Sequence, residues 1–238
     1  MKNAIVIGAS SGIGRELALE LAARGWRIGI AARRQAQLSQ LRDELPHGAE
    51  MAVVDIAKTD VAIRAVQGLI AAMGGVELVI IAAGTGDINE DLRWELEQAV
   101  IATNVCGFAA VANVAAQHFM ERRGGHLVGL SSIAALRGGR ASPAYNASKA
   151  FVSNYLEGLA QKFAKLGLPI VVTDIQAGFV DTAMAKGEGK FWVAPVDKAV
   201  RQILAAIDAR RAHAYVTRRW RLVAWLLKAM PRGLYRRA

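Results

Sequence analysis

Tyr145 and Lys149 stand four positions apart at the start of an apolar run, within the segment Ser-Pro-Ala-Tyr-Asn-Ala-Ser-Lys. On a helix, this spacing places both side chains on one face, one turn apart. A phenol is a poor acid at neutral pH, but a neighbouring ammonium stabilises its phenolate and lowers its pKa. Tyr145 can then exchange a proton with a substrate oxygen. Because a lone pair of this kind is more often a half-buried tyrosine and a solvated lysine, other residues must support the chemistry.

A glycine-rich segment follows the first apolar run of the chain. Residues 4–7 are apolar, Gly8, Gly12 and Gly14 come next, and leucines and alanines then recur with helical spacing. This order predicts a strand, a tight turn and a helix. Glycine allows the turn and the close approach of a pyrophosphate, whose charge the helix N-terminus stabilises. The alternative is a purely structural turn, but the position directly after a short strand favours a dinucleotide site.

Two arginines, Arg33 and Arg34, end the second apolar run, residues 27–32. Dinucleotide folds selective for NAD place an acidic residue here to bind the ribose 2′-hydroxyl, whereas arginine accommodates a 2′-phosphate. We therefore expect NADP(H) to be preferred over NAD(H), with Arg33 as the main contact and Arg34 and Ser10 as helpers. The alternative is that both arginines begin the solvated face of the next helix.

These motifs, together with Ser132 thirteen positions before Tyr145, resemble the short-chain dehydrogenase/reductase family over residues 4 to about 209. The glycine-rich loop has that family's Gly-x-x-x-Gly-x-Gly spacing. The resemblance implies an α/β fold, a Rossmann-type doubly wound parallel sheet with helices on both faces. It also implies an enzyme that passes hydride from NADPH to a ketone or aldehyde, or oxidises the matching alcohol.

The resemblance also implies a role for each matching residue. Ser132 and Tyr145 would bind the substrate oxygen, with Tyr145 as the proton donor. Lys149 would hold the nicotinamide ribose, and Asn104 would connect it to solvent in a proton relay. The residues expected to contact the cofactor are Gly8, Ser10, Ser11, Gly12, Ile13, Gly14, Arg33, Arg34, Asp55, Ile56, Ala83, Gly84, Tyr145, Lys149, Gly178, Val180 and Thr182.

Two positions depart from the family's pattern, since Ala82 stands where Asn is usual and Ala177 where Pro is usual. They leave room for a second hypothesis, a membrane-attached NADPH-binding sensor or scaffold with little turnover. The intact Ser132, Tyr145 and Lys149 argue against it. A third hypothesis is an NAD-linked dehydrogenase that works in the oxidative direction.

The segment from Ala183 to Trp192 contains glycines and no clear period, which is typical of a mobile lid, and we expect substrate specificity to reside there. Apolar residues near the inferred pocket indicate a hydrophobic carbonyl or alcohol substrate; they are Leu136, Phe179, Phe191 and Trp192. We expect no metal site.

The 238 residues are 53% hydrophobic and include one cysteine, Cys106. This length suits one α/β domain. One cysteine excludes an intramolecular disulfide and fits a reducing compartment. The first residues do not resemble a signal peptide, and we find no apolar run long enough to span a bilayer. We expect a cytoplasmic protein, and the family resemblance implies a homodimer or homotetramer.

The formal charge of +10 is concentrated at the end of the chain, where ten Lys and Arg face Asp208 alone from Arg201 onward. We therefore divide the chain into a nucleotide-binding domain, residues 1–209, and a basic amphipathic tail, residues 210–238.

The tail is expected to form a helix from Trp220 to Met230. A basic amphipathic helix rich in Trp and Leu is typical of an interfacial membrane binder, which would place residues 215–237 on the inner face of a membrane. The alternatives are a dimer contact or a cover over the substrate pocket. Nucleic-acid binding is not expected, because no recognition module accompanies the basic residues. The expected apolar face consists of Trp220, Val223, Ala224 and Leu227.

Overall fold

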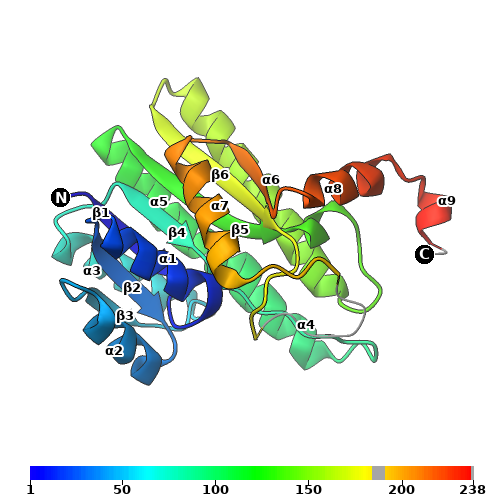
Figure 1. Cartoon of the computed structure of the whole chain (residues 1–238), viewed down its shortest axis with the longest axis horizontal. Coiled ribbons are helices and arrows are strands. Elements are labelled where there is room, and N and C mark those ends of the chain that lie inside the picture. Colours follow the sequence, from blue (N-terminus) through cyan, green and yellow to red (C-terminus); the bar gives the residue numbers. More distant parts are fainter. Residues whose placement is uncertain (184–190, 237–238) are drawn as a thin grey trace.

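The computed structural model describes residues 1–183 and 191–236. Within these residues, seven parallel strands form one sheet in the order β3-β2-β1-β4-β5-β6-β7, and helices cover both faces (Figure 1). The expected doubly wound α/β fold is confirmed. The strands are β1 (Asn3–Ile7), β2 (Arg27–Ala32), β3 (Glu50–Val53), β4 (Leu78–Ile81), β5 (Gly125–Ser132), β6 (Ile170–Ala177) and β7 (His213–Val216).

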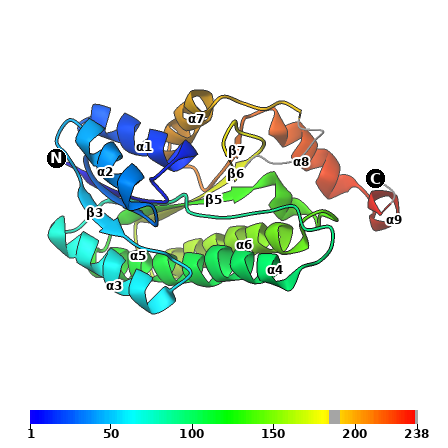
Figure 2. The same cartoon turned by 90° about the horizontal axis from the view of Figure 1, so that it is seen from below.

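The two faces of the sheet carry separate sets of helices, as Figure 2 shows edge-on. One set is α1 (Gly12–Ala23), α2 (Gln35–Glu44) and α7 (Val196–Asp208), and the other is α3 (Thr59–Ala72), α5 (Phe108–Arg122) and α6 (Pro143–Lys165). Ile5 and Val6 of β1 are fully buried in the cores on opposite faces. Because both faces are covered, the central strands are apolar throughout rather than alternating.

The order of the strands reverses between β1 and β4, since the chain adds β2 and β3 on one side of β1 and the later strands on the other. At such a reversal, the carboxyl ends of the strands leave a crevice that suits a ligand. The backbone N–H of Ala82, after β4, donates to the Ile7 carbonyl at 2.8 Å and joins the two strand ends. The candidate site therefore belongs at this edge.

The long helical stretch after β4 is divided into α4 (Trp94–Val100), the π-helix η1 (Ile101–Gly107) and α5. In the described part of the chain, Trp94–Arg122 is long and apolar enough to cross a bilayer, contrary to our expectation that no stretch would be. Phe108 and Phe119 nevertheless lie fully buried in the core under the sheet. Packing against the sheet accounts for this helix without a membrane.

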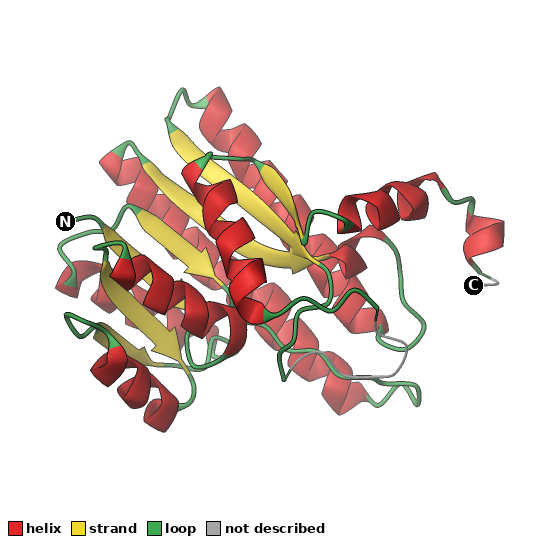
Figure 3. Cartoon of the chain, in the orientation of Figure 1, coloured by secondary structure: helices red, strands yellow, loops and turns green. Residues whose placement is uncertain are grey.

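The sheet extends past the domain boundary that we place at residue 209, because β7 pairs with β6 from His213 opposite Asp174 to Val216 opposite Ala177. What projects from the body is α8 (Trp220–Ala229) and α9 (Arg232–Tyr235). The strands point toward the side of the molecule from which α8 projects (Figure 3). The predicted boundary is thus too early, and the projecting segment starts after β7.

The apolar face predicted for α8 packs against the protein itself. Trp220 and Ala224 are buried, and Val223 and Leu227 are partly buried. The helix lies against β7 and against η2 (Ile133–Leu136), the short 3-10 helix that follows β5. The apolar face that we assigned to a membrane is therefore covered by the protein itself.

Candidate active site at the carboxyl edge of the sheet

The glycine-rich loop between β1 and α1 is packed too closely for side chains. Gly8 has a φ of +91°, and a Cβ there would lie 2.5 Å from the backbone nitrogen of Ala83. A Cβ on Gly14 would run into the carbonyl oxygen of Gly8. Gly12, with a φ of +54°, opens α1 and faces the Thr182 side chain. The loop with Ser10, Ser11 and Ile13 thus brings unhindered backbone to the crevice, as pyrophosphate binding requires.

Arg34, rather than Arg33, contacts this loop. Its guanidinium donates to Ser10 Oγ at 2.8 and 3.1 Å and to Ser11 Oγ at 2.5 Å. Arg33 turns toward Asp55, with 3.9 Å between Nη1 and Oδ2, and its side chain is 62% exposed. The structure therefore places Arg34, the residue we named as a helper, against the glycine-rich loop, and gathers one guanidinium and two hydroxyls at the end of β2.

Asp55 and Ile56, which we expect to contact the cofactor, follow β3. Asp55 Oδ1 accepts a hydrogen bond from the Ala57 N–H at 3.1 Å, which fixes the turn. Ile56 is buried, and a Cβ on Gly107 would lie 2.5 Å from its carbonyl oxygen. This turn is thereby held against η1.

Ser132, Tyr145 and Lys149 converge where β5 ends and α6 begins. Ser132 Oγ donates to the Ala177 carbonyl at 3.2 Å and accepts from the Ala134 N–H at 3.1 Å. Lys149 Nζ donates to the Leu130 carbonyl at 3.0 Å and lies 5.7 Å from the centre of the Tyr145 ring. The four-residue spacing therefore does place amine and phenol on one helix face.

Burial dominates the electrostatics of this group. It raises the pKa of the Tyr145 phenol, and a hydrogen bond with Ser132 offsets part of that rise. It lowers the pKa of Lys149 to about 8, against the opposing effect of the Asp174 carboxylate. The lowered Tyr145 pKa that we expected is wrong for the protein by itself, because desolvation of the phenolate outweighs the effect of its neighbours.

Asn104 lies in η1 and ties the segment after β4 to α6. Its Oδ1 accepts from the Thr85 N–H at 2.8 Å, and its Nδ2 donates to the Thr85 carbonyl at 2.7 Å and to Ser148 Oγ at 3.0 Å. A Cβ on Gly84 would lie 3.3 Å from Asn104 Oδ1 and 3.4 Å from Lys149 Nζ. Asn104 and Lys149 therefore border the same small space.

The segment after β6 completes the edge. A Cβ on Gly178 would overlap the indole ring of Trp220, whose N–H is buried with no hydrogen-bond partner in the described part of the chain. Val180 is buried, and Thr182 Oγ1 donates to its carbonyl at 3.4 Å. Trp220 belongs to α8, so the C-terminal tail contacts the candidate site. Its position in the sequence does not predict this contact.

A buried polar cluster behind Lys149 was not predicted from the sequence. Asp174 of β6 is 8% exposed; Ser131 Oγ donates to its Oδ1, and Gln176 Nε2 donates to its Oδ2 at 3.3 Å. A carboxylate within an apolar strand needs such partners. The signal that could have found it is the single acidic residue in the apolar run from Ile170 to Ile175.

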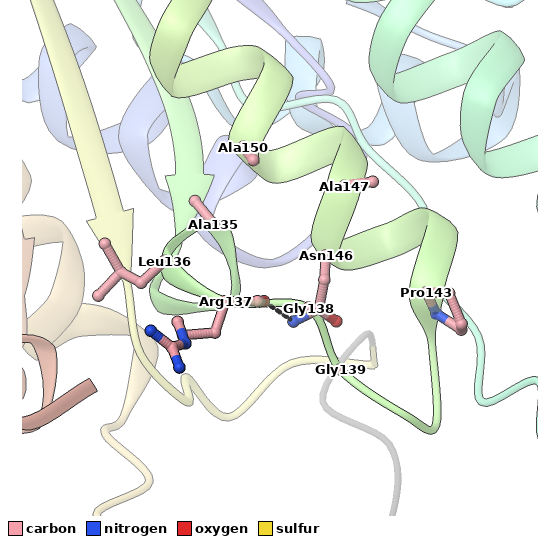
Figure 4. A pocket seen from close by; sticks show the side chains of 9 residues that line it. All are labelled: Ala135, Leu136, Arg137, Gly138, Gly139, Pro143, Asn146, Ala147 and Ala150. Atoms are coloured by element: carbon pink, nitrogen blue, oxygen red, sulfur yellow. Dashed lines mark hydrogen bonds between the residues drawn. The ribbon is translucent and has the colours of Figure 1, made fainter. Parts of the chain in front are cut away.

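A cavity of about 460 Å³ opens between η2 and the first turns of α6 (Figure 4). Leu136 lines this cavity, whereas Ser132, Tyr145 and Lys149 do not. Its lining is Ala135, Leu136, Arg137, Gly138, Gly139, Pro143, Asn146, Ala147 and Ala150.

The other three apolar residues expected near the pocket surround Trp220. Ring centres lie 5.5 Å from Trp220 for Phe179, 4.9 Å for Phe191 and 6.1 Å for Trp192. Residues 184–190 of the expected lid lie outside the described residues. Among those described, no cluster of three or more His, Cys, Asp or Glu could hold a metal ion.

A protein-family model, protein relatives and solved structures all resemble this chain. A family model for short chain dehydrogenases matches residues 2–191. An uncharacterised oxidoreductase of Myxococcus xanthus is 42% identical over 188 residues, 77% of this chain and 74% of that protein. One of Mycobacterium tuberculosis is 30% identical over 244 residues, 98% of this chain and 95% of that protein.

Solved structures share the fold. A short-chain dehydrogenase of Streptomyces avermitilis superposes with a TM-score of 0.83 at 23% identity, covering 95% of this chain and 91% of that one. A short-chain dehydrogenase of Sphingobium yanoikuyae, solved in complex with NADPH, gives 0.82 at 22% identity and covers 98% of both chains. The chain belongs to the short-chain dehydrogenase/reductase family of oxidoreductases.

Proposed function

We propose that this oxidoreductase reduces a hydrophobic ketone or aldehyde with NADPH, or oxidises the matching alcohol. The observation that carries the proposal is the meeting of Ser132, Tyr145 and Lys149 at the same sheet edge as the glycine-rich loop. Substrate oxygen and nicotinamide cofactor would then lie side by side. The protein is proposed to work in the cytoplasm as a homodimer or homotetramer.

The residues at the end of β2 fit a phosphorylated ribose. The Arg34 guanidinium donates hydrogen bonds to the Ser10 and Ser11 hydroxyls, and the chain has no acidic residue at the end of β2. A guanidinium with neighbouring hydroxyls is a good receptor for a 2′-phosphate. This arrangement supports NADP(H), with Arg34 as the main contact.

When bound, NADPH supplies the hydride that reduces the carbonyl carbon. Ser132 and Tyr145 orient the carbonyl oxygen by hydrogen bonds, and Tyr145 transfers its phenolic proton to that oxygen as charge develops. The Lys149 ammonium stabilises the resulting phenolate. Asn104, whose amide donates to Ser148 Oγ and to the Thr85 carbonyl, lies on the path by which a proton would return to Tyr145.

The test is a titration of the purified protein with NADPH and with NADH, followed by nicotinamide fluorescence as a panel of apolar ketones and aldehydes is added. Tighter binding of NADPH, and its consumption with some carbonyl, would support the reductase. Tight NADPH binding without consumption across a broad panel would instead support the sensor hypothesis. Preference for NADH would favour the NAD-linked dehydrogenase.

A further inference from the structure

The helix α8 has a second apolar face that points away from the protein. Leu222, Trp225 and Leu226 are 66%, 72% and 53% exposed. At 100° per residue, they lie opposite Trp220 and Ala224, which anchor the helix to the body. We call these three residues the outer face. Exposed Trp and Leu gathered on one helix cost free energy in water unless something covers them.

The surroundings of the outer face are strongly basic. Arg221 and Lys228 are exposed on α8 itself, and the sequence contains no acidic residue after Asp208. Beyond the helix, Arg232 and Arg236 of the tail meet Arg137 around a groove of about 650 Å³. A partner for this face must therefore carry negative charge beside apolar surface.

We propose that the outer face of α8 docks on an anionic lipid bilayer. Trp225, Leu222 and Leu226 enter the boundary between headgroups and acyl chains, and the flanking cations bind lipid phosphates. A second copy of the chain fits less well, because pairing two outer faces would bring like charges together. α8 projects from the edge that holds the candidate site, so docking turns that edge toward the membrane (Figure 1).

The contacts that anchor α8 preorganise its outer face before it binds a membrane. Trp220 is clamped by three aromatic rings, and Tyr235 Oη of α9 donates to the Gly138 carbonyl at 2.6 Å. The helix is folded and oriented without lipid, so binding does not pay the conformational entropy of forming it. The proposal needs no turnover and stands apart from the proposed enzymatic function.

The experiment is co-sedimentation of the full chain with phosphatidylcholine vesicles, with and without phosphatidylglycerol. We expect binding to the anionic vesicles alone, weakened by salt. Replacing Leu222, Trp225 and Leu226 by Ser should weaken binding about tenfold or more. These side chains are exposed, so folding should be retained. The control is Trp94→Ala, which removes a Trp that is 61% exposed on α4.

A second pair of variants tests the charges. Arg221→Glu with Lys228→Glu should weaken binding to anionic vesicles about tenfold or more, since each cation near the surface contributes about 1 kcal/mol. Lys162→Glu with Lys165→Glu makes the same charge change on exposed positions of α6 and should leave binding unchanged. Failure of the wild-type chain to bind anionic vesicles at low salt would overturn the proposal. So would serine variants that lose self-association but keep vesicle binding.

Discussion

The two halves of the candidate site are built in different ways. The nucleotide half, from β1 through α1 to the end of β2, lies within the first 34 residues and depends mainly on backbone shape. The catalytic half depends on side chains from β5, β6, η1 and α6, which are joined by hydrogen bonds between residues 19 to 45 positions apart. Changes in the first half should therefore weaken cofactor binding while sparing kcat, whereas loss of a single polar atom in the second half should abolish turnover.

Tyr145→Phe should give the largest difference between an effect on turnover and an effect on cofactor binding. Removal of the proton donor is expected to lower kcat about 1,000-fold, which is roughly 4 kcal/mol of transition-state stabilisation. The NADPH dissociation constant should change less than about twofold, because the glycine-rich loop is untouched. Steady-state kinetics and fluorescence titration measure the two quantities. Retained turnover would remove Tyr145 from its proposed role.

Arg34→Ala should do the reverse. Loss of a charged hydrogen-bonding group is expected to raise the dissociation constant for NADPH about tenfold to a hundredfold, with little change for NADH. At saturating NADPH, kcat should remain near that of the wild type. Arg33→Ala is the matched control and should have a smaller effect, because that side chain is largely exposed. Equal losses for NADPH and NADH would argue against a 2′-phosphate contact.

Gly178→Ala tests the junction of the catalytic edge with α8. The new methyl group would displace the Trp220 indole, and we expect unfolding free energy to fall by about 1–3 kcal/mol. Gly158→Ala is the control, since it lies in α6 with open space around its Cβ position and should raise stability by about 0.5–1 kcal/mol. Denaturant unfolding measures both. If Gly178→Ala left the unfolding free energy unchanged, this contact would not be what holds α8.

His126 gives a pH test that involves neither half. Its Nε2 pairs with Thr173 Oγ1 at 2.8 Å, and burial lowers its pKa to about 4. The His126 side chain thus stays neutral in the folded state, whereas in the unfolded chain it takes up a proton below about pH 6.5. Stability should be full above pH 6.5 and fall as the pH drops toward 4, by about 2 kcal/mol between pH 7 and 5. In the His126→Gln variant, the difference in unfolding free energy between pH 7 and pH 5 should be smaller by about 2 kcal/mol.

Asp174→Asn should give the smallest change and probes the support of the catalytic half. The carboxylate raises the pKa of Lys149 against burial, so its loss should lower that pKa further. Because the proposed reduction needs the ammonium, the alkaline limb of the kcat profile should move to lower pH. Asp174→Glu, which keeps the charge, should restore it. A fall in kcat with an unmoved limb would indicate a purely structural role.

Much of the nucleotide half was predictable from the sequence. Strand, glycines and helix follow one another within a few residues, and the constraint acts through backbone geometry, so a local pattern carries it. Which of Arg33 and Arg34 lies against the loop was not predictable, because adjacent residues at a strand end point in different directions. Only packing decided that Arg34 contacts Ser10.

The sequence by itself determined the parallel α/β fold, the family and the pairing of Tyr145 with Lys149, because each depends on short-range periodicity or spacing. Tertiary structure alone decided the rest. Burial, not charge proximity, sets the direction of the Tyr145 pKa. The cluster at Asp174 and the contact of Trp220 with Gly178 join strands and a tail that are distant in sequence. Helical periodicity found an amphipathic α8, but it could not tell which of its apolar faces the body of the protein would cover.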